Sequence, residues 1–410
     1  MRIFIGLADT ASQASDLKKG FSVLGIETYA AILETHNITA NAVDRVLSRR
    51  NFLTNLPIRP TRLQQFLRYG FRRHLLFREA AQTCDVFIFV WQSFYADARD
   101  LAYLKRIGKK IVVFFMGSEQ RWKNAYEQEM CLFDIPSYYS RYEKKSYECS
   151  FKKLKSTLRY LRQVEKYADV IYSLPNQSQL SLRPYSHFYI PVDIEIIEEK
   201  AAQRKIPIIA HAPSSRAVKG TDLVLNALEK LKNEGVTFEI RLIENMPHKD
   251  ALRTFTDSDI VIGELFIPSA GKLDREALAA GKVVLSSVRR DYIDNLPAEC
   301  PIIDVNPQTL YDELKKTILN YPRRVELAQR ARPFVEKYHT IGGLCHDILQ
   351  KLDSSATEKE YDFYPTFFRE QFNPEGEEYC QLYNRWTYFV SKTDWYRIFV
   401  SRGERNGLIF

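Results

Sequence analysis

Short, fully apolar runs recur along this chain, each bounded by polar turns and separated from the next by a helix-like segment. The first is RIFIGLA at residues 2–8, and DVFIFVW at 85–91 and KKIVVFFMG at 109–117 have the same character. Strands that are apolar on both faces belong to parallel sheets that helices cover on each side. The pattern therefore predicts a doubly wound, Rossmann-like α/β domain.

The same alternation restarts in the second half of the chain. A strand-like run at 205–213, KIPIIAHAP, precedes a leucine-rich helix that Gly235 ends, and DIVIGEL at 259–265 is a further strand. A chain of 410 residues is also too long for one ordinary core. We therefore expect two Rossmann-like domains, at 1–193 and 194–350.

Residues 351–410 differ from both halves, because tyrosine, phenylalanine and tryptophan crowd them. That composition is too apolar for a disordered tail, so we predict an extension that packs on the rest of the molecule or meets a partner. No run of eighteen apolar residues occurs, and MRIFIGLAD lacks a cleavage pattern, so we expect no spanning helix and no signal peptide. The six cysteines form no CxxC pair, which argues against a zinc site and favours the reducing cytoplasm.

The net charge of +8 is concentrated at residues 49–79, which carry eight arginines and a single acid, Glu79. Phenylalanine and leucine lie between the arginines. Such a segment can lie on the inner face of a membrane, with arginines at the headgroups and rings at the acyl boundary. The alternative is a solvated helix with one core face. Nucleic-acid binding would depend on net charge alone, and we do not expect it.

Phosphate binding is suggested by two glycine–lysine pairs, which begin at Gly271 and Gly281. Neither fits a Walker loop, and G-x-G-x-x-G is absent. What remains is the N-terminus of the helix that holds Glu276, which the small residues Ser269, Ala270 and Gly271 precede. Free amides and the helix dipole favour a diphosphate there.

A second candidate is HAPSSRAVKGTD at 211–222, which follows the first strand of the second domain. Arg216 and Lys219 lie three residues apart on a loop that enters a helix, so they can grip a diphosphate from the other side. The alternative is ordinary surface charge. The acids at 257–259 form a D-x-D run, but they lie between a helix and a strand, where an acidic turn is common, so we predict no metal site.

The second domain resembles the family-four retaining glycosyltransferases of the GT-B fold. The resemblance is carried by HAPSSRAVKGTDLVLNALEKLK, IENMPHKDALRTFTDSDIVIGEL and GKLDREALAAGKVVL, with weaker echoes in DVFIFVW and KKIVVFFMGSEQR, and it covers residues 1–350. It implies two Rossmann-like domains facing a cleft, with the nucleotide sugar on the second and the acceptor on the first. It also implies transfer with retention of configuration and without a metal or other cofactor.

The resemblance assigns roles to individual residues. Arg216 and Lys219 match the family's phosphate-binding basic residues, and Glu276 matches the glutamate that binds the donor ribose. Because charge builds up on the departing phosphate, Arg216 and Lys219 are the predicted catalytic residues. The other predicted contacts to the nucleotide sugar are Ser214, Ser215, Glu244, Asn245, Met246, Ala270, Gly271, Lys272 and Leu273.

Two positions depart from the family pattern. Pro268 stands where many members have a glutamate, and Met116, which cannot donate a hydrogen bond, stands where a related block has a histidine. The predicted function is transfer of a sugar to a glycan or lipid-linked acceptor in polysaccharide biosynthesis. The first alternative is a non-catalytic GT-B protein that binds nucleotide or glycan as a partner subunit. A second is a sugar-nucleotide epimerase, for which His211 is the chief candidate acid or base.

Overall fold

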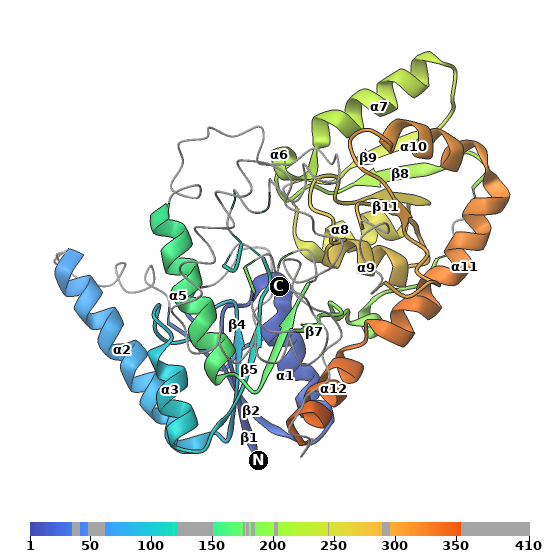
Figure 1. The fold of residues 1–410 in the computed structure, drawn as a ribbon. Helices are drawn as coiled ribbons and strands as arrows, with labels where there is room; N and C mark the ends of the chain where they lie inside the picture. Colours follow the sequence, from blue (N-terminus) through green and yellow to red (C-terminus); the bar gives the residue numbers. More distant parts are fainter. Residues whose placement is uncertain are drawn as a thin grey trace, which may run out of the picture. The chain divides into compact units, whose positions relative to one another are not determined.

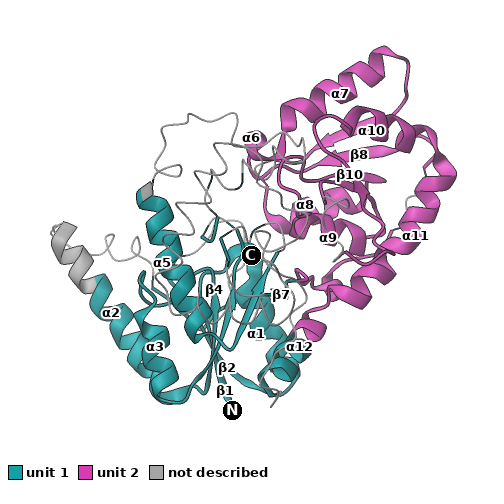
Figure 2. Ribbon diagram, viewed as in Figure 1, with its two compact units in different colours: residues 1–126, 145–188, 345–410 teal, residues 127–144, 189–344 magenta. Residues whose placement is uncertain are grey.

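The computed structural model describes residues 1–34, 42–47, 62–117, 119–121, 123, 126, 151–174, 177, 180–181, 185–200, 204–244, 246–288 and 296–353. The chain divides into two compact units, made of residues 1–126, 145–188 and 345–410 and of residues 127–144 and 189–344 (Figure 2). Three predictions fall largely or wholly outside the described residues: the aromatic-rich extension beyond 353, the part of the basic segment at 49–61, and Asn245.

The first unit is built on a seven-stranded sheet in the order β3-β2-β1-β4-β5-β6-β7, and all its neighbouring strands pair in parallel (Figure 1). The strands with predicted apolar runs lie at its centre and are buried, whereas β3 and β7 are two-residue edge strands. The strands are β1 (Arg2–Leu7), β2 (Glu27–Ile32), β3 (Arg45–Val46), β4 (Val86–Val90), β5 (Lys110–Phe114), β6 (Val170–Ser173) and β7 (Ser186–His187).

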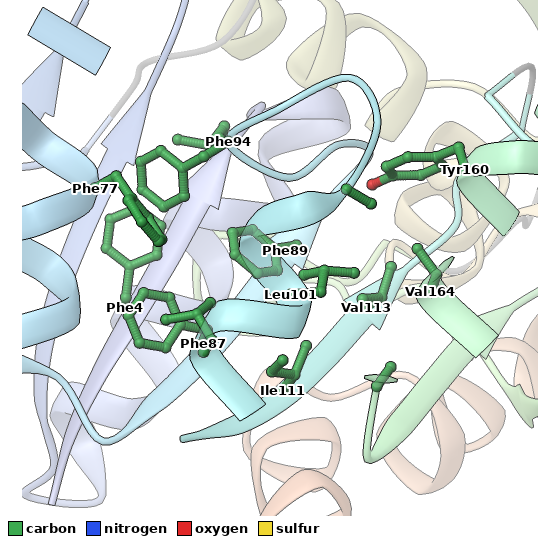
Figure 3. Close-up of a cluster of buried hydrophobic side chains, with 14 of the residues drawn as sticks. Phe4, Phe77, Phe87, Phe89, Phe94, Leu101, Ile111, Val113, Tyr160 and Val164 are labelled. Carbon is green, nitrogen blue, oxygen red and sulfur yellow. The ribbon is translucent and has the colours of Figure 1, made fainter. Parts of the chain in front are cut away.

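Helices cover this sheet because its side chains alternate between two apolar faces. Phe87 and Phe89 of β4 point to one face, where they join Phe4 of β1, Phe77 of α2 and Leu101 of α3 in a buried cluster (Figure 3). The ring centroids of Phe4 and Phe87 are 5.5 Å apart. The helices of the unit are α1 (Gln13–Val23), α2 (Arg62–Thr83), α3 (Arg99–Arg106), α5 (Phe151–Tyr167) and the end of α12 (Ile341–Asp353), with a 3-10 turn at Thr10–Ser12.

The last described helix, α12, returns the chain to the first unit. The Tyr172 hydroxyl of β6 donates a hydrogen bond to Asp347 at 2.5 Å, and Lys110 of β5 donates to the carbonyl of Leu352 at 2.6 Å. Cys345 is fully buried against the α1 backbone. Residues 345–353 are therefore part of the core of the first unit.

The second unit is built on a five-stranded parallel sheet in the order β12-β11-β10-β8-β9 (Figure 1). Its strands are β8 (Ile208–His211), β9 (Glu239–Leu242), β10 (Ile260–Ile262), β11 (Val283–Ser286) and β12 (Ile303–Asp304). Its helices are α6 (Arg216–Lys219), α7 (Thr221–Asn233), α8 (His248–Thr256), α9 (Lys272–Ala279), α10 (Leu310–Leu319) and α11 (Tyr321–Tyr338), with a 3-10 turn at Ile194–Ile196.

Both faces of the second sheet are apolar and covered. Ile260 and Ile262 of β10 belong to a buried cluster with α7 and α10. Val261, between them, belongs to another with α8, α9 and α11. This alternation explains why the sequence run is continuously apolar, and it confirms the predicted architecture of two Rossmann-like α/β domains.

Among the described residues, the chain passes to the second unit after Phe188 and returns to the first after Leu344. Within the described part of the chain, none of the helices combines the length and the apolarity that a membrane span requires.

Candidate functional site

The candidate site lies at the carboxyl edge of the second sheet. β9 lies on one side of β8 and β10 lies on the other, so the order of winding reverses at β8. Doubly wound sheets bind ligands outside the carboxyl ends of their strands at such a switch point. The segments that follow β8, β9 and β10 carry every residue predicted to contact the nucleotide sugar.

The segment after β8 forms the single-turn helix α6, which begins at Arg216 and ends at Lys219. Gly220 ends it in the left-handed conformation, with φ 69°, which favours glycine. A Cβ at Gly220 would also lie 3.0 Å from the ring of Phe266, in the segment after β10. The tight turn thus brings the two segments into contact, while Ser214 and Ser215 are exposed ahead of it.

Lys219 forms an ion pair with Glu264, shortly after β10, and each side chain is only 11% exposed. Burial alone would lower the pKa of Lys219, but the facing carboxylates of Glu264 and Asp274 outweigh it and hold that pKa above its usual value. The ion pair joins the segments after β8 and β10, so it lies at the switch point.

The tip of α9 lies beside this ion pair. The amide of Gly271, the N-cap residue, donates to Oδ2 of Asp274, as in half of a capping box. This amide is therefore occupied, although the sequence predicted free amides ahead of Glu276. The other oxygen of Asp274 is buried and has no hydrogen-bond partner among the described residues. Burial raises the pKa of Asp274 to about 6, since Glu264 adds to the effect of burial and Lys219 offsets only part of it.

Arg216, the second predicted cation, binds Glu244 from the segment after β9. Nε and Nη2 of Arg216 lie 2.8 and 2.6 Å from the two carboxylate oxygens, which is bidentate geometry. These hydrogen bonds lower the pKa of Glu244. The structure thus unites two predicted site residues, and it gives each predicted cation a carboxylate partner.

Glu276 is buried on α9, and its Oε1 lies 2.9 Å from Nε2 of His248, the first residue of α8. Ala277, Ala279 and Ala280 around it are fully buried in the layer between α9, the sheet and α11. Small side chains allow the helix to lie close to its neighbours, so the alanine-rich run fixes the position of the carboxylate.

The remaining predicted contacts lie along the same edge. Ala270 is buried with φ 39°, an uncommon conformation for a residue with a side chain, and its carbonyl accepts a hydrogen bond from Arg275. Lys272 and Leu273 begin α9 and are half-buried, and Met246 packs at the edge of the core under α8.

His211 is unsuited to acid–base chemistry. Its Nδ1 lies 2.8 Å from the carbonyl of Ile262, and its Nε2 lies 3.0 Å from the hydroxyl of Thr221. Burial lowers its pKa to about 4, which keeps the ring neutral. The epimerase alternative therefore loses its chief candidate. In the D-x-D run, Asp259 is buried and accepts the amide of Ile208 at 2.8 Å, which is a structural role.

Known proteins were compared with the chain by sequence and by structure. No known protein family and no curated protein matches the sequence. Sucrose-phosphate synthase from Thermosynechococcus elongatus matches 87% of this chain and 99% of its own, with a TM-score of 0.56 and 10% identity. HepE of Anabaena in complex with UDP and glucose matches 86% of this chain and 98% of its own, with a TM-score of 0.53 and 10% identity. An alpha-glucosyltransferase in complex with UDP-glucose and DNA containing an abasic site matches 86% of this chain and 98% of its own, with a TM-score of 0.54 and 13% identity.

The chain has the GT-B glycosyltransferase fold. The fold predicted from the sequence blocks is thus confirmed, at identities that carry no information on individual residues.

Three residues of this GT-B chain belong to the candidate site although the sequence did not single them out: Glu264, Asp274 and His248. Glu264 could have been found because it follows a parallel strand at its carboxyl end. Asp274 stands three residues after Gly271, which is the spacing of a capping box. His248 is the second residue of the PHKDA block that carries part of the GT-B resemblance, but the block alone assigned it no role.

Proposed function

We propose that this protein is a glycosyltransferase that moves a sugar from a nucleotide-diphosphate donor to a glycan or lipid-linked acceptor. The observation that carries the proposal is the convergence of Lys219, Arg216 and Glu276 on the carboxyl edge of one sheet in a GT-B chain. Two of the structures with this fold hold UDP or UDP-glucose, which supports a uridine nucleotide as the donor.

In the proposed reaction, Lys219 and Arg216 bind the donor diphosphate, with the N-terminus of α9 adding its dipole. Negative charge increases on that diphosphate as the sugar leaves, so the two cations stabilise the transition state more than the bound donor. Glu276 accepts hydrogen bonds from the ribose diol. The reaction needs no metal in this scheme and retains the anomeric configuration.

A lipid-linked acceptor is favoured by the surface of α2. Phe71 and Leu75 lie one helical turn apart and are 62% and 43% exposed, and Arg72 and Arg78 of the same helix are exposed too. Exposed apolar residues flanked by arginines are suited to an anionic membrane surface. We therefore place the protein in the cytoplasm, at the inner face of the membrane.

A panel of UDP-, GDP-, CMP- and dTDP-sugars tests the proposal. We expect one nucleotide class to raise the melting temperature, because a ligand that binds only the folded state stabilises it. The same class should undergo transfer or slow hydrolysis. If no sugar nucleotide binds and none is hydrolysed, the proposal is wrong.

A non-catalytic GT-B protein is the second candidate, and the ion pair between Lys219 and Glu264 favours it because the cation already has an anion. Met116, which stands where a histidine would donate to the ligand, adds to this argument. Nucleotide binding without transfer, unaltered in Glu276→Ala, would select this candidate.

A further inference from the structure

Three charged groups converge on the tip of α9, where the donor diphosphate is expected. A Cβ built on Gly271 would lie 3.5 Å from Oε1 of Glu264, 3.9 Å from Nζ of Lys219 and 3.9 Å from Oδ2 of Asp274. The protein's own carboxylate thus occupies the position beside Lys219 that a phosphate oxygen would take.

The charges of this group do not suit a diphosphate. Glu264 and Asp274 both face the ammonium of Lys219. The other nearby cation, Arg275 of α9, donates to the carbonyl of Ala270. From β11, the uncharged hydroxyl of Ser286 donates a hydrogen bond to Asp274 at 3.1 Å. A diphosphate would therefore add negative charge beside two buried carboxylates, which is unfavourable at low dielectric.

We propose that Glu264 holds Lys219 in the donor-free protein, that the diphosphate of a nucleotide sugar displaces Glu264 from Lys219, and that Asp274 takes up a proton during the exchange. This inference rests on the proposed function. It makes Glu264 an internal competitor for the donor and Asp274 the group that neutralises the surplus charge.

Asp274 is the proton acceptor because its surroundings already favour the protonated form. Burial raises its pKa to about 6, and the ammonium of Lys219 lowers it in part. When Lys219 turns to the diphosphate, its ammonium lowers the pKa of Asp274 less than before, and the diphosphate adds negative charge nearby. The pKa then rises towards neutrality, and the proton can occupy Oδ1, the buried oxygen without a partner among the described residues.

Calorimetry of the full-length protein with UDP-glucose tests the exchange. Titrations at pH 7 in two buffers with different ionisation enthalpies, both containing EDTA, measure the protons taken up. The phosphates of UDP-glucose carry no group that titrates near neutral pH, so the uptake belongs to the protein. We expect uptake of roughly half a proton at pH 7, with an affinity that falls as the pH rises, by about two- to threefold per pH unit near pH 7.

Two variants separate the roles. E264Q should bind UDP-glucose roughly fivefold more tightly, because a neutral partner holds an ammonium less strongly than a carboxylate does, and its affinity for uridine should stay unchanged. D274N should bind without proton uptake. The matched control is E234Q, which removes an exposed ion pair with Lys315 at the far end of α7 and should behave like the wild type.

The outcomes distinguish this inference from the proposed function. UDP-glucose binding to the wild type without proton exchange, and no tighter to folded E264Q, would overturn the inference alone. If UDP-glucose binding requires added magnesium, the inference is overturned too, because the metal ion and not a proton on Asp274 would then neutralise the added charge. If the panel selects another sugar nucleotide, that compound replaces UDP-glucose in these titrations, and if none binds the wild type or E264Q, both proposals fail. Should E264Q not fold, the proton measurement on the wild type decides.

Discussion

Nε2 of His248 lies 2.9 Å from Oε1 of Glu276, so the glutamate predicted to bind the donor ribose already has an imidazole partner. Glu276 is buried, whereas the side chain of His248 is 41% exposed. The contact joins the segments after β9 and β10 across the strand β8 that separates them in the sheet. It therefore links a buried carboxylate of α9 to a partly exposed ring at the start of α8.

Replacing Glu276 with glutamine should weaken nucleotide binding. The amide keeps the shape of the side chain but loses one acceptor and the charge that strengthens its hydrogen bonds, so we expect roughly tenfold weaker UDP-glucose binding. Isothermal titration measures it. Glu239→Gln, an exposed residue of β9, is the control. Equal affinities in the two variants would contradict a ribose-binding role.

Gly263→Ala should destabilise the second unit, because a Cβ there would lie 1.8 Å from Oδ1 of Asp274. Overpacking of this kind costs about 1–3 kcal/mol. Asp274→Ala removes the carboxylate that accepts a hydrogen bond from the amide of Gly271, a loss of about 1 kcal/mol. The double variant should be more stable than the sum of the two losses predicts, since it removes the clash. Denaturant unfolding measures all three, and strict additivity would show that residues 263 and 274 do not meet.

His211 should make the protein less stable in acid. Its pKa is about 4 in the folded state and 6.5 in ordinary surroundings, so the unfolded chain binds the proton first as the pH falls. Its contribution of about 3 kcal/mol is complete above pH 6.5 and is lost as the pH falls to about 4. Asp274, whose pKa is raised, acts in the opposite direction over pH 6 to 4.

The difference between the wild type and His211→Gln isolates this effect, because Asp274 is present in both. Denaturant unfolding at pH 7, 5.5 and 4.5 should show a smaller loss of stability in the variant. If the wild type and the variant lose the same stability as the pH falls, His211 is not buried in its neutral form.

The exposed apolar residues of α2 should support membrane binding. Replacing both Phe71 and Leu75 with serine should reduce cosedimentation with phosphatidylglycerol vesicles on the order of tenfold or more, given the apolar area removed. Val23→Ser, on α1, is the matched control because Val23 is also apolar and exposed. If the α2 double variant and the control bind equally well, α2 is not the contact surface.

The fold could be predicted because the central strands are apolar on both faces, which only a covered parallel sheet explains. Prediction failed where local signals conflict with packing. The helix α11 was not predicted, since Pro333 lies inside it and lowers helix propensity. Tertiary contacts stabilise α11 by burying Phe334 and Val335 against α9.

The site could be predicted only in part, because sequence blocks identify residues but not their partners. Arg216 and Lys219 were found, whereas Glu264 lies 45 residues from Lys219 and no spacing rule links them. Charge compensation within the site depends on which strands are neighbours, and that order emerges only when the sheet forms.

The return of α12 to the first unit has a consequence for biosynthesis. Tyr172 and Lys110 acquire their partners Asp347 and Leu352 only after translation has passed residue 352. Residue 352 follows Leu344, the last residue of the second unit, in the chain. The unit that begins the chain is thus the later one to be completed, because its last core helix is synthesised after every residue of the second unit.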